Sequence, residues 1–436
     1  MASSPVSGPT EAQPGSQTAS LKTETQRLLK AGINFFNANQ DGWALAMFKK
    51  AYLLSGRLPE SPSQARCLFN LGAAYIATGK PSKGLRCLWK SRGAVAQEED
   101  GDFYFNVAAA YDCLREYAKA ADFYRKAVHE YGTDQTRSAA EALTKLAYCL
   151  VSTGDTARAA QTFRQAGRAY QRVQLLEDAA MAMREAANYF LRSPNYSQDD
   201  VLETLEACGQ LCTGIANQEL LGKLYNDLGL HYAEIRRFEQ AERHFDAALE
   251  LCDRRGNFSI QKRAVLLQNL GATCNALEQF ARSLRFHSEA ADMYGALGEG
   301  QRAAQAQCIY NLATAHRQLK NYNMAEFYYQ QAQKAFAEAG DSDGEARVCE
   351  ELGTTHLCQG HFDQAIRDYT HALGLFEKSK EISDGPQERI REKMADVENH
   401  RANASQGHVS HSDGFLDSDA DVRMGAGVAS RFPNDL

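Results

Sequence analysis

Small and large side chains recur along the chain with a period close to forty residues. The recurring element is a small residue followed three positions later by a large one, as in LGAAY (71–75). The small residues of this element, which serve as anchors for alignment, are Gly32, Gly72, Ala108, Ala147, Ala186, Gly229, Gly271, Ala313 and Gly353. Successive anchors are 36 to 43 residues apart. A period of this length is typical of an array of similar supersecondary units.

A second set of positions supports the same alignment. Twelve, sixteen and nineteen residues after an anchor, most units have a small, a large and a small residue, as in Ala120, Tyr124 and Ala127. The fifth unit fits only if its turn, RSPNYSQDD, contains about three extra residues. Small residues facing each other let two antiparallel helices approach closely, and large ones fill the space toward the next unit. The pattern predicts an all-α solenoid of about nine helix hairpins over residues 21–380.

Three segments carry a family resemblance: CLFNLGAAYIATGKPSKGL (67–85), FNVAAAYDCLREYAKAADFYRKAV (105–128) and LLGKLYNDLGLHY (220–232). They resemble tetratricopeptide repeats, in a longer form that is similar to the Leu-Gly-Asn G-protein-signalling modulators. The resemblance implies a right-handed superhelix that acts as an adaptor without an assigned activity. The chain lacks the acidic-Gln-Arg ending of the modulators' G-protein-binding motifs, so the resemblance predicts no G-protein partner.

The two ends of the chain differ from the repeats. Residues 1–20 are too polar to bury a core and are predicted to be a disordered tail. Residues 384–402 form a charged segment with Pro386 near its start, and we expect a capping helix there. Residues 403–436 are rich in Gly, Ser, Asp and Ala, which predicts a second disordered, acidic tail.

In such a superhelix the first helix of each hairpin lines a groove. The position two before the anchor is polar in all nine units. Its members include Asn70, Asn106, Lys145, Arg184, Asp227, Asn269 and Asn311, and beside them stand Phe69, Phe105, Tyr148, Tyr310 and Arg317. An asparagine can both donate to and accept from a peptide backbone, so this polar ladder predicts a peptide-binding groove. The alternative is that these positions simply face solvent.

Lys145 and Arg184 occupy equivalent places in neighbouring units and predict a basic patch for an acidic side chain or a phosphate. The fifth unit, with its longer turn, leaves open whether the solenoid bends there. It is equally open whether the Asn70–Asn106 and Asn269–Asn311 blocks bind one peptide or two.

Signatures of chemistry are missing from the sequence. The 11 Cys are spread singly without a C-x-x-C pair, and no nucleotide-binding, zinc-protease or serine-hydrolase motif occurs. We therefore expect no enzyme, no cofactor, no metal and no small-molecule substrate. The net charge of −7 and the lack of a long apolar stretch predict neither nucleic-acid binding nor membrane insertion. Unpaired cysteines without a secretory signal predict a cytoplasmic protein.

Two functional hypotheses follow. The leading one is a protein–protein interaction scaffold that binds an extended peptide of a partner in the groove. The alternative is a structural scaffold that self-associates into a homo-oligomer, with the groove idle or autoinhibited by the chain's own tail.

Overall fold

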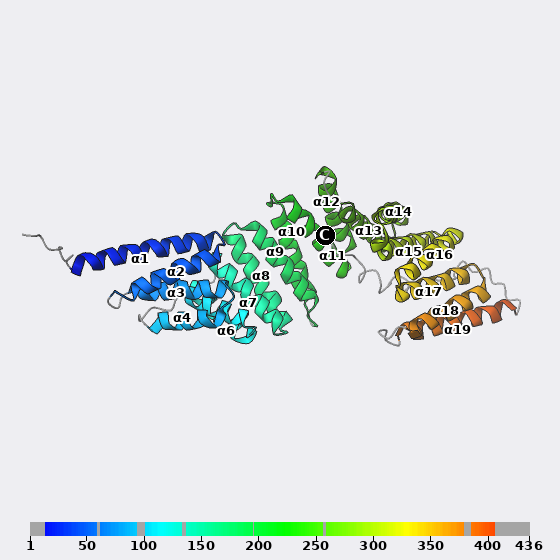
Figure 1. Cartoon of the computed structure of the whole chain (residues 1–436). Coiled ribbons are helices and arrows are strands. Elements are labelled where there is room, and N and C mark those ends of the chain that lie inside the picture. The colour runs from blue at the N-terminus through cyan, green and yellow to red at the C-terminus, as the bar shows by residue number, and fades with distance from the viewer. Residues whose placement is uncertain are drawn as a thin grey trace, which may run out of the picture. The chain divides into compact units, whose positions relative to one another are not determined.

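The computed structural model describes residues 14–58, 62–93, 101–132, 137–194, 196–255, 259–378 and 385–405. These ranges contain nineteen α-helices, one short 3-10 helix and no strand, so the predicted all-α class is confirmed. Eighteen of the helices form nine consecutive hairpins, and α19 follows the last one (Figure 1). None of the helices in the described ranges is both long and apolar enough to cross a membrane.

Each predicted repeat supplies one hairpin. The first helices are α1 (Pro14–Asn37), α3 (Pro62–Ala77), α5 (Gly101–Cys113), α7 (Arg137–Ser152), α9 (Leu176–Leu191), α11 (Gln218–Glu234), α13 (Ile260–Ala276), α15 (Arg302–Gln318) and α17 (Ser342–Cys358). The second helices are α2 (Asp41–Ser55), α4 (Pro81–Gly93), α6 (Tyr117–Tyr131), α8 (Thr156–Arg172), α10 (Gln198–Cys212), α12 (Phe238–Arg255), α14 (Phe280–Leu297), α16 (Tyr322–Ala339) and α18 (Phe362–Lys378). The 3-10 helix η1 (Glu299–Gln301) precedes α15, and α19 spans Gly385–Ser405.

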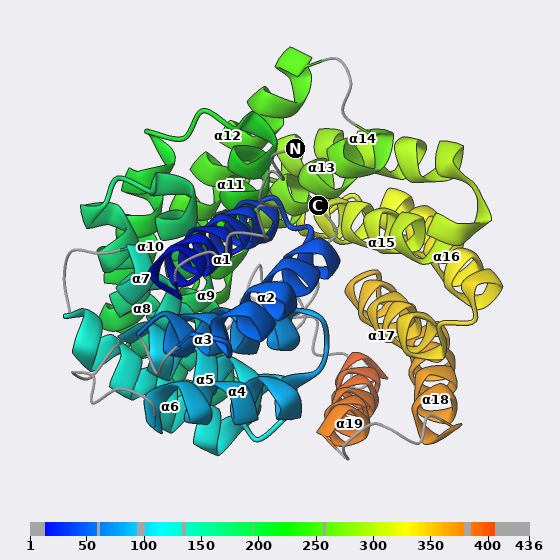
Figure 2. The ribbon, with the colours of Figure 1, turned by 60° about the vertical axis from the view of Figure 1, so that its left-hand side comes forward.

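The chain divides into two compact units, Met1–Leu211 and Cys212–Leu436. Unit 1 contains the first five hairpins, and the division falls at the last residue of α10. Unit 2 contains the remaining four hairpins and α19. Figure 2 shows the hairpins of unit 2 following one another from α13 to α18, with α19 beside α18.

Close contact between a small and a large side chain holds each hairpin together. A Cβ atom added to Gly32 would lie 2.5 Å from the Phe48 ring, and one added to Gly229 would lie 2.5 Å from the Phe245 ring. Both rings are buried, with exposures of 2% and 0%. A side chain at either anchor would therefore displace the ring that fills the hairpin, which explains why these anchors are glycine.

The fifth hairpin follows the shifted alignment that allowed about three extra residues in its turn. Its small, large and small positions are Val201, Leu205 and Cys208, and all three are fully buried. The Cys208 thiol donates to the Ala180 carbonyl oxygen at 3.4 Å and joins α10 to α9. The longer turn therefore leaves the packing of the repeat intact.

The turns within the hairpins require a left-handed backbone residue. Gly79 and Gly154 have φ angles of 73° and 83°, which glycine adopts without a steric penalty. Arg115 takes the same conformation in the third hairpin, with a φ of 60°. A non-glycine residue in this region is strained, so the turn geometry there is imposed by the packing of the two helices.

The ends of the array differ in part from the expectation. Helix α1 begins at Pro14, so residues 14–20, expected in a tail, are helical. The rest of both predicted tails, residues 1–13 and 406–436, lies outside the described residues. Helix α19 covers the expected capping segment, and its fully buried Ile390 and Val397 pack with Phe376 of α18. The apolar end of the ninth hairpin is therefore covered, whereas the full division into tails, array and cap stays a prediction.

Candidate functional site

The first helices of unit 1 carry two asparagines in equivalent positions. Asn70 of α3 and Asn106 of α5 are both partly exposed. The Asn70 Nδ2 atom donates to the Arg66 carbonyl oxygen at 2.9 Å, and the Asn106 Nδ2 atom donates to the Asp102 carbonyl oxygen at 2.8 Å. Each amide is thereby oriented by its own helix and keeps an Oδ1 acceptor and a second N–H for another group. We call the surface formed by α3, α5, α7 and α9 the first-helix face of unit 1.

Aromatic rings stand beside these asparagines. Phe69 and Phe105 are half-buried and pack against the same core cluster, which includes Val107. The Phe105 ring meets Tyr124 edge-on, with centroids 5.4 Å apart. Tyr148 of α7 is 46% exposed and meets the buried Phe163 ring edge-on at 4.9 Å. The rings therefore leave part of their surface open next to the polar ladder, as side-chain pockets require.

The predicted basic patch is partly neutralised. Lys145 is exposed, but it lies near the half-buried Asp112 of α5, and Arg184 pairs with Glu185 of its own helix. Burial raises the pKa of Asp112, while Lys145 acts in the opposite direction. The prediction of a basic patch considered only one position of each repeat, and the structure adds the acidic neighbours Asp112 and Glu185. Asp112 follows its anchor Ala108 by four residues, one helical turn along α5.

In unit 2 the polar ladder is more enclosed. Asp227 and Asn269 are 7% and 0% exposed. The Asn269 Nδ2 atom donates to Asn226 Oδ1 at 3.0 Å, across from α13 to α11. The expectation that Asp227 and Asn269 present open side chains to a ligand therefore differs from the structure. Asn226 was not predicted as a partner because it lies three before its anchor, where five of the other eight units have an apolar or aromatic residue.

Asn311 of unit 2 is half-buried and is also engaged within the chain. Its Oδ1 atom accepts from Gln307 Nε2 at 3.0 Å, and its carbonyl oxygen accepts from Asn275 Nδ2 at 3.4 Å. These bonds tie α15 to itself and to α13. Of the two asparagine blocks, the one in unit 1 is therefore the more accessible.

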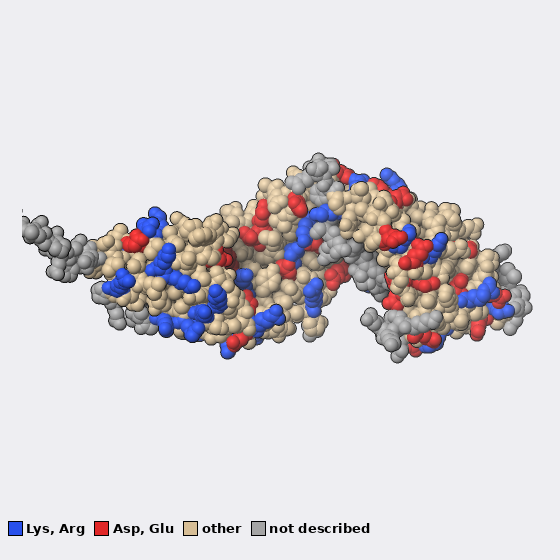
Figure 3. All heavy atoms as spheres, viewed as in Figure 1, with Lys and Arg blue, Asp and Glu red and all other residues tan. Residues whose placement is uncertain are grey.

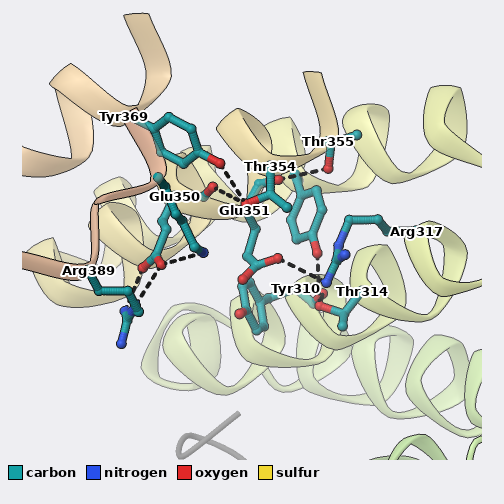
Figure 4. Close-up of polar contacts among 11 residues, drawn as sticks. Tyr310, Thr314, Arg317, Glu350, Glu351, Thr354, Thr355, Tyr369 and Arg389 are labelled. Atoms are coloured by element: carbon teal, nitrogen blue, oxygen red, sulfur yellow. Dashed lines mark hydrogen bonds and ion pairs between the residues drawn. The ribbon is translucent and has the colours of Figure 1, made fainter. Parts of the chain in front are cut away.

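Arg317, expected to form a pocket, is instead half of an ion pair. Its Nη2 atom lies 3.2 Å from Glu351 Oε2 and joins α15 to α17 (Figure 4). The exposed fractions of the two side chains are 10% and 21%. Burial lowers the pKa of Arg317 and Glu351 raises it, with a net rise. Tyr310 lies nearby, and burial together with Glu351 raises its pKa well above the usual value.

Two hairpins of unit 2 share a further polar device. The Thr314 and Tyr329 hydroxyls are 3.0 Å apart, and so are the Thr354 and Tyr369 hydroxyls. Each pair joins the position after the anchor to the large position sixteen after it, within one hairpin. The tyrosines are fully buried, so these bonds satisfy hydroxyl groups that have left water.

The end of unit 2 carries a buried carboxylate. Glu350 of α17 has a side chain only 4% exposed and accepts from Arg389 through two bonds of 2.9 and 2.7 Å and from Lys393 at 2.8 Å. Burial raises the pKa of Glu350, but the two cations of α19 lower it more, so the net change is downward. This contact fixes α19 against the ninth hairpin (Figure 4).

The histidine and cysteine side chains of the described residues make local polar contacts or pack in the core. His356 lies between Asp368, 2.5 Å away, and Glu326, 3.4 Å away, and the Asp368 carboxylate raises its pKa. All 11 cysteines lie in the described ranges and none forms a disulfide, and eight of them are buried. Burial raises the pKa of Cys149 to about 12, which keeps the thiol protonated. Over the described ranges no three His, Cys, Asp or Glu side chains are grouped as metal ligands are.

Repeated helix hairpins, each locked by a small residue against a large one, define the chain as a helical repeat protein. Residues 262–338 and 305–378 match the family model of the tetratricopeptide repeat. Residues 262–378 therefore consist of tetratricopeptide repeats, and the other described hairpins have the same arrangement of two antiparallel helices. The finer resemblance to the G-protein-signalling modulators stays a prediction.

Known proteins show distant similarity over most of the chain. The 43 kDa receptor-associated protein of the synapse from Tetronarce californica is 21% identical over 369 residues, which cover 83% of this chain and 76% of that protein. A signal transduction ATPase of the STAND class with a tetratricopeptide repeat sensor, from Pyrococcus horikoshii, is 13% identical with a TM-score of 0.48. It matches 81% of this chain and 53% of its own. The quorum sensor NprR from B. thuringiensis is 12% identical with a TM-score of 0.40, over 82% of this chain and 99% of its own.

Proposed function

We propose that the chain is a protein-interaction scaffold that binds an extended peptide segment of a partner along the first-helix face of unit 1. The observation that carries the proposal is the pair Asn70 and Asn106. Each is partly exposed, each amide is oriented by its own helix, and each stands next to a half-buried phenylalanine. An extended peptide can bond its backbone to such amides while its side chains contact the rings.

The chemistry of the face favours a mainly uncharged peptide segment. Lys145 and Arg184 stand near Asp112 and Glu185, so this part of the face presents both signs of charge. A segment with alternating polar and apolar side chains would match the amides and the aromatic rings. The distant similarity to a protein described as receptor-associated supports a protein as the partner.

We place the scaffold in a reducing compartment such as the cytoplasm and assign it no enzymatic activity. Buried, unpaired thiols such as Cys149 and Cys274, whose pKa burial raises to about 12 and about 11, suit a compartment in which thiols stay reduced. The described residues offer side chains for packing and for hydrogen bonding rather than a convergent set of acid and base groups.

The test uses peptides selected from a random twelve-residue display library on the full chain. Binding of a selected peptide is then measured by fluorescence polarisation with Asn70→Ala combined with Asn106→Ala. Each lost hydrogen bond is worth about fivefold in affinity, so the double variant should bind roughly 25-fold more weakly. Asn34→Ala with Asn37→Ala removes two exposed asparagines of α1, off the ladder, and should leave affinity unchanged.

Two outcomes would count against the proposal. Selected peptides that bind the ladder variant as well as the wild type would show that the asparagines are not the site. Failure to enrich any peptide, together with concentration-dependent oligomers in light scattering that persist in the ladder variant, would favour the self-associating scaffold.

A further inference from the structure

Positive charge is concentrated in a short part of unit 1. Residues 42–97 contain nine Lys or Arg and a single acidic residue, Glu60, in a chain whose total charge is −7. The net charge of the whole chain therefore hides a strongly basic segment. Figure 3 shows Lys and Arg gathered over this part of unit 1 with few acidic side chains among them.

The second helices α2 and α4 carry much of this charge on their outer sides. Lys50 of α2 and Lys90 of α4 both lie eighteen residues after their anchors, so the repeat places them on the same face of unit 1. Lys83 and Arg86 extend that face along α4. All four side chains are exposed, and none makes an ion pair with another described residue. We call this surface the outer basic face.

Large apolar side chains stand among these cations. Trp43 and Leu53 of α2 are 65% and 70% exposed, and Trp89 of α4 is 44% exposed. One edge of Trp89 is anchored, since its ring meets Phe103 edge-on at 5.3 Å. These are the only two tryptophans in the chain, and each lies on a helix that carries the outer basic face. Exposed tryptophan and leucine beside these exposed cations mark an interaction surface, because solvent alone would not favour them there.

We propose that the outer basic face docks on the surface of an anionic lipid bilayer. Lysine and arginine would lie among the acidic headgroups, with the indole rings at the boundary between headgroups and acyl chains, where tryptophan is favoured. Leu53 favours a bilayer over a nucleic acid as the binding partner. An exposed leucine neither stacks on a base nor binds a phosphate, whereas its transfer to the boundary of the acyl chains is favourable. The charge spreads over two helices of consecutive hairpins, which suits an extended anionic surface.

The test measures binding of the full chain to large vesicles at 0.1 M NaCl. Vesicles of 30% phosphatidylserine in phosphatidylcholine should pull down the chain and shift its tryptophan emission to shorter wavelength, whereas pure phosphatidylcholine should do neither. Because both tryptophans lie on α2 and α4, the helices that carry the face, their emission reports on docking. Higher salt should weaken binding.

Matched variants locate the site. Lys83→Gln with Arg86→Gln and Lys90→Gln should lower the partition coefficient by about two orders of magnitude, at roughly fivefold per cation. The control removes three exposed cations of unit 2, as Arg285→Gln, Lys334→Gln and Arg367→Gln, and should bind as the wild type does.

Equal loss in the two triple variants would overturn the proposal, since binding would then depend on total charge alone. Equal binding to neutral and acidic vesicles would do the same. Binding of poly-uridine RNA or of poly-glutamate that needs the α4 cations, without binding to the acidic vesicles, would assign the face to a nucleic acid or to an acidic protein. Trp43→Ala with Leu53→Ala, which keeps every charge and leaves Trp89 as reporter, should reduce both the binding and the emission shift.

Discussion

The seventh hairpin buries a histidine where most other hairpins have a phenylalanine or tyrosine. His287 of α14 is fully buried, and its ring lies so close to Gly271 that a Cβ atom there would be 2.7 Å from it. Neither ring nitrogen makes a hydrogen bond of good geometry within the described residues. Burial lowers the pKa of His287 to about 3, against a smaller upward effect of the Gly271 backbone. We therefore predict that unit 2 loses stability in mild acid because of this residue.

The direction and size of the change in stability follow from the linkage between protonation of His287 and folding. The imidazole is neutral in the folded chain down to a pKa of about 3, but in the unfolded chain it takes a proton below its ordinary value of 6.5. Stability from this residue is therefore complete above 6.5 and is lost as the pH falls toward 3. Between pH 7.5 and 5.0 the loss amounts to about 2 kcal/mol. This figure changes little as long as the folded-state pKa is well below 5.

The assay compares the wild type with His287→Phe by urea denaturation, followed by circular dichroism at 222 nm, at pH 7.5 and 5.0. Phenylalanine suits the site, since Phe48 and Phe245 face glycine anchors in the same way. The variant should be the more stable at both values, and its advantage should grow by about 2 kcal/mol at the lower pH. His361→Gln removes an exposed histidine and should follow the wild type. An advantage that is the same at both pH values would refute the reasoning.

Two further predictions concern packing and the cap of unit 2. Gly229→Ala should cost about 1–3 kcal/mol of unfolding free energy in urea denaturation, because its Cβ would lie 2.5 Å from the Phe245 ring. Gly42→Ala, with nothing within 4 Å, should instead be neutral or stabilising, and a similar effect of both changes would contradict the packing argument. Arg389→Met with Lys393→Met should destabilise unit 2 by about 3–5 kcal/mol, because it leaves the buried Glu350 carboxylate without a cation. Glu350→Gln should cost only about 1 kcal/mol, because Arg389 and Lys393 are 52% and 31% exposed and remain solvated without the carboxylate. Hydrogen exchange of the α19 amides measures the loss of stability in each variant. A larger loss in Glu350→Gln than in the double methionine variant would refute this prediction.

Much of the fold could be predicted because the same pattern of small and large residues occurs in each of the nine repeats. A small anchor and a large residue sixteen positions later are enough to place each hairpin. The fifth hairpin shows how far this reaches, since Val201, Leu205 and Cys208 are buried despite the longer turn. The division of the described chain after α10 could not be predicted, because it depends on how consecutive hairpins contact one another and not on the residues within one hairpin.

Side-chain partners across neighbouring hairpins were the hardest part of the candidate site to predict. A single ladder position identified Asn70 and Asn106, which the structure leaves partly exposed, but gave Asn269 the same meaning although it is buried. Arg317 was similarly expected to be open, yet Glu351 of the next first helix pairs with it. A repeat alignment specifies the helix face of each residue, whereas pairing depends on the distance between consecutive helices.

A hydrogen bond inside a hairpin can be predicted only from two repeat positions together, the residue one after the anchor and the large residue sixteen after it. Tyr329 and Tyr369 each face a threonine one residue after their anchors, and each pair is 3.0 Å apart. The hairpin of Phe245 has Leu230 at that offset, and a phenylalanine ring has no hydroxyl to satisfy. A buried tyrosine hydroxyl without a partner is costly, and in these two hairpins the threonine of the first helix supplies the partner. The third hairpin has Tyr124 but Ala109 at that offset, so a tyrosine alone does not indicate this bond. Reading the two offsets as a pair therefore predicts which hairpins of a repeat array carry an internal hydrogen bond as well as apolar contact.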